Sequence, residues 1–131
     1  MADDLLEVEL VAADRKVWTG EARMVVARTT DGDIGILPGH APILGILGDG
    51  AVQIRGEGGD EVIAAVHGGF LSVADNRVGI LAEVAELADE IDLERAQRAL
   101  ENAHQDHDDD DEAVAAGQRA EARIRAHGLA F

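Results

Sequence analysis

The first two thirds of the chain alternates apolar and polar residues with the period of a β-strand. Leu6, Val8, Leu10 and Ala12 occupy every second position near the N-terminus, as expected for a strand with one buried face. Shorter apolar runs follow at residues 17–28, 50–55, 61–66, 70–74 and 78–82. Short strands at such spacing are typical of an all-β sandwich or a small barrel. We therefore expect residues 1–86 to form a β-sandwich domain that contains no helix of useful length.

Turn-forming residues separate these runs. Clusters of Gly, Asp and Asn occur at residues 31–33, 56–60, 68–69 and 75–76, and these residue types tolerate the positive φ angles of tight hairpins. The segment from Asp31 to Leu47 also contains Pro38 and Pro42, which have no amide proton to donate. The sequence therefore predicts an irregular loop over Asp31–Leu47 rather than a central strand.

The last third of the chain has the apolar period of a helix instead. Leu93, Ala96, Leu100 and Ala103 recur at spacings of three and four, which places them on one helical face. Asp92 stands just before them, where its carboxylate can accept hydrogen bonds from the unpaired amides of the first turn. The pattern thus predicts a helix that begins after Asp92.

A second helix is expected after an acidic interruption at Asp106 and residues 108–112. Helical periodicity resumes from Ala113 to Ala126, and Gly128 is a plausible C-terminal stop. Residues 87–131 should therefore form a helical hairpin, in which two antiparallel helices are joined by an acidic loop. The expected fold class is α+β: an N-terminal all-β sandwich followed by a C-terminal two-helix antiparallel hairpin.

The facing residues of this hairpin are largely alanine, and Gly117 lies inside the second helix. Burial of an alanine removes less apolar area than burial of a leucine, at about 25 cal/mol per Å². Helices of this length are also marginal alone in water. The packed and unpacked arrangements should then differ by only a few kcal/mol, as a switch requires. The alternative is a helical tail that stays docked on the sandwich.

Composition excludes several classes of function. The formal charge of −16 disfavours contact with nucleic-acid phosphates and with anionic lipid headgroups. The absence of cysteine excludes disulfides and thiolate metal sites. The N-terminus has no signal-peptide pattern, and no apolar run approaches the roughly 20 residues of a membrane span. We expect a soluble intracellular protein with no nucleic-acid partner and no direct membrane insertion.

Candidates for catalytic chemistry are few. His40 and His67 would have to form the metal pair of a metalloenzyme, but no close His-x-His or His-x-x-x-His spacing supports one. We expect a structural or interface role for His40 and a strand-end position for His67. Ser72 is the only serine, and it lacks the Gly-x-Ser-x-Gly context of a nucleophile. The common Gly-rich phosphate loops are also missing. The sequence predicts no catalytic residue and no metal site.

Three motifs follow one another along the chain. Residues 32–44 read G-x-x-G-I-L-P-G-H-A-P-I-L, residues 68–73 read G-G-F-L-S-V followed by I-L-A-E at 80–83, and residues 91–96 read I-D-x-x-R-A. In sequence and in order these motifs resemble those of the epsilon subunits of bacterial F-type ATP synthases. An aromatic residue, Trp18, followed by Gly20 also fits. The resemblance covers nearly the whole chain.

The resemblance implies a non-catalytic subunit of the central stalk, peripheral to the cell membrane on its cytoplasmic side. Its partners would be the gamma subunit, the ring of c subunits and the catalytic alpha/beta head, and it would couple the rotation of gamma to the c-ring. In the family, the loop that corresponds to Asp31–Pro42 faces the ring. Asp33 and His40 are therefore candidate ring contacts, and a partner would cover the apolar Ile34, Ile36 and Leu37.

The resemblance also implies regulation of ATP hydrolysis. Members of the family restrain hydrolysis by extending the hairpin into the catalytic head, and in some of them bound ATP holds the hairpin down. The residues implicated correspond to Ile91, Asp92, Arg95 and Ala96, with Arg123 as a further candidate. The guanidinium of Arg95 suits phosphate oxygens. No cofactor is required, and regulatory ATP is the candidate ligand.

Plainer and rival interpretations stay open at this point. Asp92 is also well placed as a simple helix cap, with Arg95 paired in solvent. The chain could instead be a small cupin-like metalloenzyme that uses His40 and His67. It could also be a stand-alone ATP-sensing module without a rotor partner.

Overall fold

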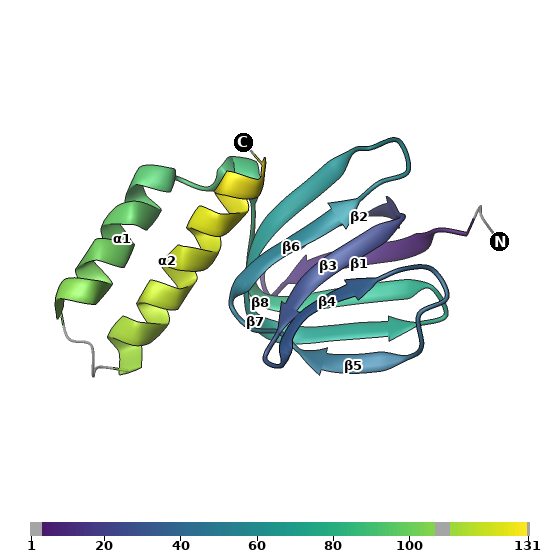
Figure 1. The fold of residues 1–131 in the computed structure, drawn as a ribbon, viewed down its shortest axis with the longest axis horizontal. Coiled ribbons are helices and arrows are strands. Elements are labelled where there is room, and N and C mark those ends of the chain that lie inside the picture. Colours follow the sequence, from purple (N-terminus) through teal and green to yellow (C-terminus); the bar gives the residue numbers. More distant parts are fainter. Residues whose placement is uncertain (1–3, 107–110, 131) are drawn as a thin grey trace.

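The computed structural model describes residues 4–106 and 111–130, which form a β-sandwich with a two-helix hairpin against one side (Figure 1). The expected fold class is confirmed. The strands are β1 (Leu6–Ala12), β2 (Lys16–Ala22), β3 (Met24–Thr29), β4 (Gly32–Ile36), β5 (Ile43–Ile46), β6 (Gly50–Arg55), β7 (Glu61–Ala74) and β8 (Arg77–Leu87). A 3₁₀ turn, η1 (Ala88–Glu90), leads into the helices α1 (Leu93–Asp106) and α2 (Asp111–Ala130).

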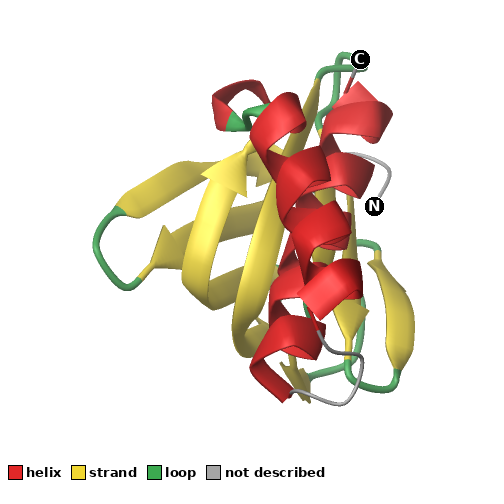
Figure 2. Ribbon diagram, turned by 90° about the vertical axis from the view of Figure 1, so that its left-hand side faces the viewer, coloured by secondary structure: helices red, strands yellow, loops and turns green. Residues whose placement is uncertain are grey.

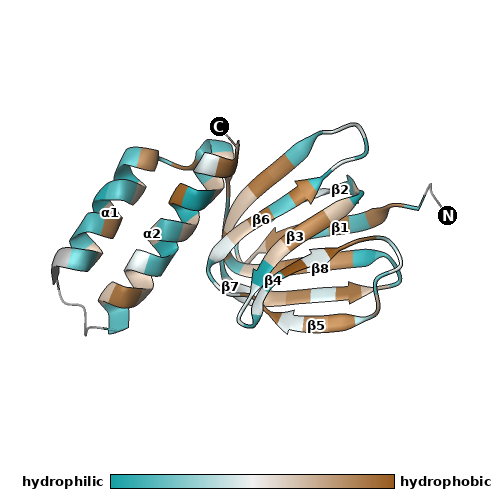
Figure 3. Cartoon of the chain, in the orientation of Figure 1, coloured by the Kyte–Doolittle hydropathy of each residue, from teal (hydrophilic) through white to brown (hydrophobic). Residues whose placement is uncertain are grey.

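The strands follow the order β2-β1-β8-β7-β6-β3-β4, and β5 pairs with β7 outside this path. Residues 61–66 of β7 pair with β6, whereas residues 70–73 pair with β5. Because the two halves of β7 have different neighbours, the strands curve around one core. Figure 3 shows apolar residues alternating with polar ones along the strands. The largest fully buried side chains are all aliphatic: Leu6, Val8, Leu10, Val25, Ile36, Val52, Ile54, Val66, Leu71, Val73, Val78 and Ile80.

Gly68 and Gly69 lie inside β7, so the turn expected at this pair is wrong. The chain does not reverse here, because β7 keeps one antiparallel register with β8 from Ala64 to Ala74. The φ angles of Gly68 and Gly69 are 68° and 114°, in the region that favours glycine. A Cβ on Gly69 would collide with the carbonyl oxygen of Leu81. The two glycines therefore let β7 bend while it stays paired.

This bend changes which residues of β7 face the core. Ala64 and Val66 are core residues before the bend, whereas Leu71 and Val73 are core residues after it. Inward positions therefore move from even to odd numbers, which an unbroken period of two cannot produce. The side of β7 that points away from the core therefore faces the hairpin in the first half of the strand and faces solvent in the second half.

The segment from Asp31 to Leu47 is more regular than predicted. It contains β4, which pairs with β3, and β5, which pairs with β7. The irregular part is limited to residues 37–42, and both prolines lie there, outside the two ladders. The prolines interrupt only the connection, because the strands on either side keep their amide donors. Residues 17–28 likewise form two strands, β2 and β3, instead of one run.

The hairpin packs against the sandwich through α2, which contacts β6, β7 and η1, while α1 packs chiefly on the outer side of α2 (Figure 1). Figure 2 shows both helices in front of the strands. The N-cap at Asp92 is confirmed, because its Oδ1 accepts the amide of Arg95 at 3.1 Å. Gly117 faces α1, and a Cβ there would lie 3.4 Å from Cβ of Ala103. The helix stop expected at Gly128 is wrong, because α2 continues to Ala130. Part of the acidic interruption, residues 107–110, lies outside the described residues.

Candidate functional site

An exposed apolar surface spans β5, β7 and β8. Cross-strand pairing places Ile46 opposite Phe70, and Phe70 opposite Leu81. Leu44 on β5 is 74% exposed, and the others are about half exposed. We call this surface the apolar face: Leu44, Ile46, Phe70, Leu81 and Val84. A contiguous exposed patch of large apolar residues marks a protein contact more often than free surface.

The apolar face follows from the bend in β7. Beyond Gly69 the inward positions are Leu71 and Val73, so Phe70 and Ser72 point outward. The motifs at residues 68–73 and 80–83 contain Phe70 and Leu81, but periodicity alone did not show that they are neighbours on an outer surface. Only the β7–β8 register does so.

A shallow hollow adjoins this surface over β1, β2 and the β7–β8 hairpin. Its lining includes Ser72 and Gly79, which lie next to Phe70 and Leu81 on their strands, together with Glu7, Glu9 and Glu21. The one basic group that lines the hollow is Arg77, and its Nε lies 3.5 Å from the Glu7 carboxylate. A complementary partner would therefore have an apolar centre and basic groups at one edge.

The connection from β4 to β5 forms the end of the sandwich opposite the hairpin (Figure 1). The amide of Gly39 donates to Oδ1 of Asn76 at 2.7 Å, which ties this connection to the β7–β8 turn. His40 is half-buried, and its Nδ1 lies 2.7 Å from the carbonyl oxygen of Ala41. The imidazole is thus held in the loop and is reachable from solvent.

The two candidate ring contacts do not lie together. Asp33 is the second residue of β4, beside the β3–β4 turn, and its Oδ1 lies 3.6 Å from Nε of Arg28. His40 lies beyond the other end of β4. The apolar residues of the same segment also separate, since Ile36 is fully buried in the core while Leu37 is 55% exposed. The expectation that a partner covers Ile36 is therefore wrong.

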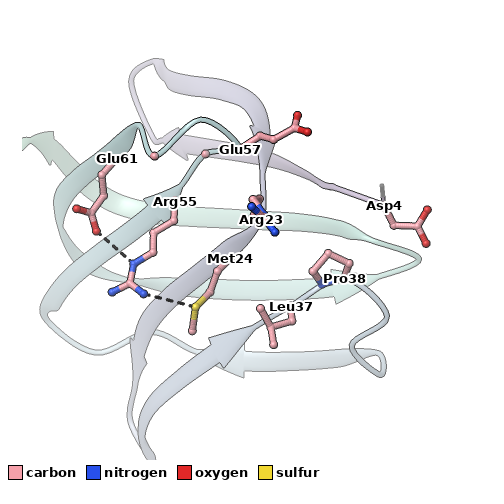
Figure 4. A pocket seen from close by; sticks show the side chains of 10 residues that line it. Asp4, Arg23, Met24, Leu37, Pro38, Arg55, Glu57 and Glu61 are labelled. Atoms are coloured by element: carbon pink, nitrogen blue, oxygen red, sulfur yellow. Dashed lines mark hydrogen bonds and ion pairs between the residues drawn. The ribbon is translucent and has the colours of Figure 1, made fainter. Parts of the chain in front are cut away.

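A second cleft of about 690 Å³ opens where Leu37 and Pro38 approach β3 and the β6–β7 turn (Figure 4). Its most prominent charged group, Arg55, is already engaged: Nε donates to Oε1 of Glu61 at 3.3 Å, and a terminal nitrogen contacts Sδ of Met24. We find no nucleophile paired with a base in this cleft. Its mixed lining is more typical of a protein contact than of an active site.

The residues matched to the regulatory ATP site surround the start of α1. Ile91 and Ala96 are buried, and the carboxylate of Asp92 caps the helix. Arg95 is exposed, and its guanidinium has no ion-pair partner within the described ranges. Arg123 on α2 instead donates from Nε to Oε1 of Glu86 at 2.6 Å. In this arrangement Arg95 is the basic group of the set that is available to an anion.

The structure does not bring His40 and His67 together. His40 lies in the β4–β5 connection, which Gly39 ties to Asn76 in the β7–β8 turn. His67 lies nine residues before Asn76, which at about 3.3 Å per residue is on the order of 30 Å along the strand. His67 is not at a strand end as expected, since it lies in the middle of β7 and is buried under α2. Within the described residues, no three or more His, Asp or Glu side chains form a group that could hold a metal ion.

Comparison with known proteins gives concordant results. Residues 5–88 match the family model for the β-sandwich domain of the ATP synthase delta/epsilon chain. The ATP synthase epsilon chain of Streptomyces griseus is 63% identical, over 92% of this chain and 94% of its own length. That of Thermobifida fusca is 53% identical, over 92% and 90%, and that of Rhodococcus jostii is 49% identical, over 92% and 94%.

Solved structures agree with the sequence relatives. A chain in the Euglena gracilis mitochondrial ATP synthase, in an assembly of OSCP, F1 and c-ring, superposes with a TM-score of 0.79 at 26% identity, covering 96% of this chain and 81% of that one. A chain from the central stalk and c-ring of the Tetrahymena thermophila enzyme has a TM-score of 0.57 at 19% identity, covering 95% of each, and shows the fold alone. In the part of the chain that the structure describes, neither helix has the length and hydropathy of a membrane span.

Proposed function

The chain belongs to the ATP synthase epsilon-chain family, and we propose that it is a non-catalytic central-stalk subunit that couples the rotation of gamma to the c-ring. It would act at the cell membrane as a peripheral subunit on the cytoplasmic side. Its hairpin would reach the alpha/beta head and restrain ATP hydrolysis. High identity to epsilon chains over nearly their full length supports this proposal.

The observation that carries the proposal is the apolar face. A row from Ile46 through Phe70 to Leu81 lies on a rigid sheet and is about half exposed. Full burial of such a side chain from water is worth roughly 1.5–3 kcal/mol, and because these are already half buried, a partner that covers the row gains roughly half of that at each. We assign gamma to this surface because a rotating coupling subunit needs a stiff, extended contact with the shaft. The acidic hollow beside it suits basic residues on gamma.

The direct test is binding of gamma to a charge-substituted apolar face. Phe70→Glu should weaken the complex at least thirtyfold, as for a central interface residue worth about 2 kcal/mol or more. Val114→Glu on α2 is the matched control, because Val114 is also apolar and about half exposed. Titration of both variants with gamma should show the loss only for Phe70→Glu. If the two variants bound gamma with equal affinity, the apolar face would be excluded as the gamma-binding surface.

The rival interpretations are less favoured. A cupin-like metalloenzyme would need His40 and His67 at one site, but His40 lies in the β4–β5 connection and His67 lies in the middle of β7. A stand-alone ATP-sensing module would not need the apolar face. Copurification separates this second rival from our proposal, because a sensor without a rotor partner would not travel with gamma.

We also propose a regulatory ATP site at the start of α1, formed by Ile91, Asp92, Arg95, Ala96 and Arg123. The supporting observation is that no ion pair among the described residues engages the guanidinium of Arg95, which stands beside the end of the helix that Asp92 caps. Arg95 would hold phosphate oxygens through its planar fork. Arg123 would join only by leaving Glu86. The buried Ile91 and Ala96 would shape the site through packing and not through polar contacts.

This site predicts a selective effect of Arg95. Arg95→Ala should weaken ATP binding at least fivefold, because a charge-assisted contact to phosphate is lost. Arg98→Ala is the control, since Arg98 is exposed on the same helix and lies outside the matched motif. Calorimetry with ATP measures both. The same affinity in Arg95→Ala and the unaltered chain would exclude this site.

A further inference from the structure

The seam between α2 and the sandwich contains one polar cluster in an otherwise small apolar contact. Its apolar part consists largely of alanine: Ala51, Ile63, Ala65, Ala88, Ile91 and Ala126. Beside it, His67 from β7 is buried under α2 and is only 4% exposed. Because little apolar area is buried in this contact, the charged groups around His67 contribute a large part of the free energy that docks the hairpin on the sandwich.

An ion pair between Arg123 and Glu86 crosses this seam. Nε of Arg123 on α2 donates to Oε1 of Glu86 on β8 at 2.6 Å, and both side chains are 29% exposed. This pair is short, charge-assisted and partly shielded from solvent, so it should contribute more than a surface salt bridge. It is therefore a polar tie between the hairpin and the sandwich.

His67 lies directly against this tie. Its Nε2 is 3.5 Å from the same Glu86 oxygen that Arg123 uses, and its Nδ1 is 3.4 Å from Oδ1 of Asp49. Neither ring nitrogen has a hydrogen-bond partner among the residues that the structure describes. A neutral imidazole carries one N–H, so one of the two carboxylates must face a nitrogen lone pair. The docked arrangement thus leaves the ring poorly satisfied.

Protonation of His67 would place a second positive charge beside the Glu86 carboxylate. The charged ring would compete with Arg123 for one carboxylate and would repel the guanidinium. Burial, and next the positive charge of Arg123, hold the pKa of His67 below its ordinary value of 6.5, while Asp49 and Glu86 act in the opposite direction. Release of the hairpin would expose the His67 ring and move Arg123 away, so both causes of the lowered pKa would be lost, while both carboxylates would stay beside the ring.

Thermodynamic linkage fixes the direction of the effect. If docking lowers the affinity of His67 for a proton, a proton on His67 must weaken docking by the same factor. His67 has a lower pKa when the hairpin is docked, so its contribution to docking is fully present above the undocked pKa and is lost as the pH falls from there through the docked pKa. One proton gives at most about a tenfold change in the docking equilibrium per pH unit.

We propose that His67, Glu86 and Arg123 form an acid-sensitive latch, which keeps the hairpin on the sandwich at neutral pH and releases it when His67 gains a proton. The charged groups that face the ring are Asp49 before β6, Glu86 on β8 and Arg123 on α2. Farther out, Arg28, Glu121 and Arg125 line the cleft beside Asp49. Acidification would thereby free the helices, and under the proposed function it would favour the hydrolysis-restraining state.

The chain carries its own reporter of docking. Trp18, its only tryptophan, lines one cleft together with Leu129 and Ala130 at the end of α2. Release of α2 would expose the Trp18 ring on that side and shift its emission. The test uses the isolated full chain, so its result is independent of the role of the hairpin in ATP synthase.

The experiment is a reversible pH titration from about pH 8 to about pH 5.5, across the ordinary range of histidine. Trp18 emission and hydrogen exchange of α2 should report undocking at the acid end in the unaltered chain. His67→Gln should abolish this transition while retaining a polar side chain. His127→Asn and His40→Asn should keep it.

A second variant keeps the test decisive if His67→Gln folds poorly. Arg123→Gln removes the tie, so its Trp18 emission at pH 8 should already match that of the unaltered chain at acid pH. Arg125→Gln, two residues along α2, should behave like the unaltered chain. The proposal is overturned if the unaltered chain shows no transition, if His67→Gln retains it, or if Arg123→Gln stays docked.

Discussion

At the scale of single residues, the structure explains why two glycines stand in the motifs of the sequence. Gly20 follows Trp18 by two positions on β2, so both face the same side of the strand. A Cβ on Gly20 would lie 2.6 Å from the Trp18 ring, which means that the indole lies over the glycine. Gly69 is required for a different reason, because the Leu81 carbonyl occupies the space of a side chain. Neither contact is visible from periodicity.

The separation of Asp33 and His40 leads to a prediction at the same scale. If the c-ring meets one end of the sandwich, we expect only one of these residues to touch it, because Asp33 lies at the start of β4 and His40 lies beyond its end. Of Asp33→Lys and His40→Glu, one should reduce proton-driven ATP synthesis at least about threefold and the other should have little effect, since a change of side-chain charge acts mainly where two surfaces meet.

Inverted membrane vesicles that carry each variant give the measurement, with ATP hydrolysis recorded in parallel to show that assembly is intact. Asp60→Lys, in the exposed β6–β7 turn, is the control for a change of net charge. Similar losses from Asp33→Lys and His40→Glu would contradict a contact at one end.

At the scale of elements, the hairpin is the part whose attachment is weakest. It contacts the sandwich through α2, and its seam is built mainly from alanine and two isoleucines. The main core is separate, since all its buried members lie between Leu6 and Ala85. The sandwich should therefore fold without the helices, and the helices should detach before the sandwich unfolds.

A truncation tests what the hairpin does. A chain that ends at Ala88 keeps the apolar face and the main core, so it should bind the catalytic head with gamma as the full chain does. The full chain should slow ATP hydrolysis by this complex, and the truncated chain should not, because the helices that reach the head are missing. Circular dichroism checks that the truncated sandwich is folded. If both chains bind and hydrolysis is equal, the hairpin is not a brake.

At the scale of the whole molecule, the functional surfaces point in different directions. The apolar face covers the outer side of β5, β7 and β8, the β4–β5 connection forms one end, and the hairpin covers the first half of β7 (Figures 1 and 2). A single rigid sandwich can thus contact several partners at once. The formal charge of −16 keeps the uncovered surface soluble and favours basic partner surfaces.

Much of this organisation could be predicted from local pattern. The alternation at Leu6–Ala12 gave β1, the Gly50–Arg55 run gave β6, and Asp92 gave the start of α1, because these features depend on neighbours a few residues away. The resemblance in three motifs gave the family. The predicted ends of helices and strands were wrong where tertiary contacts override local preference, as at Gly128, which stays helical.

The amino-acid sequence by itself therefore determined the class of fold, the order of sandwich and hairpin, and the family. Tertiary structure alone decided the apolar face, the opposite positions of Asp33 and His40, and the burial of His67 beside Glu86 and Arg123. The physical reason is range: periodicity and caps act over a turn or a strand, whereas these arrangements depend on the bend at Gly68–Gly69 and on strand register. His67 and Arg123 lie 56 positions apart in the sequence, and only the docking of α2 on β7 brings them to the same carboxylate.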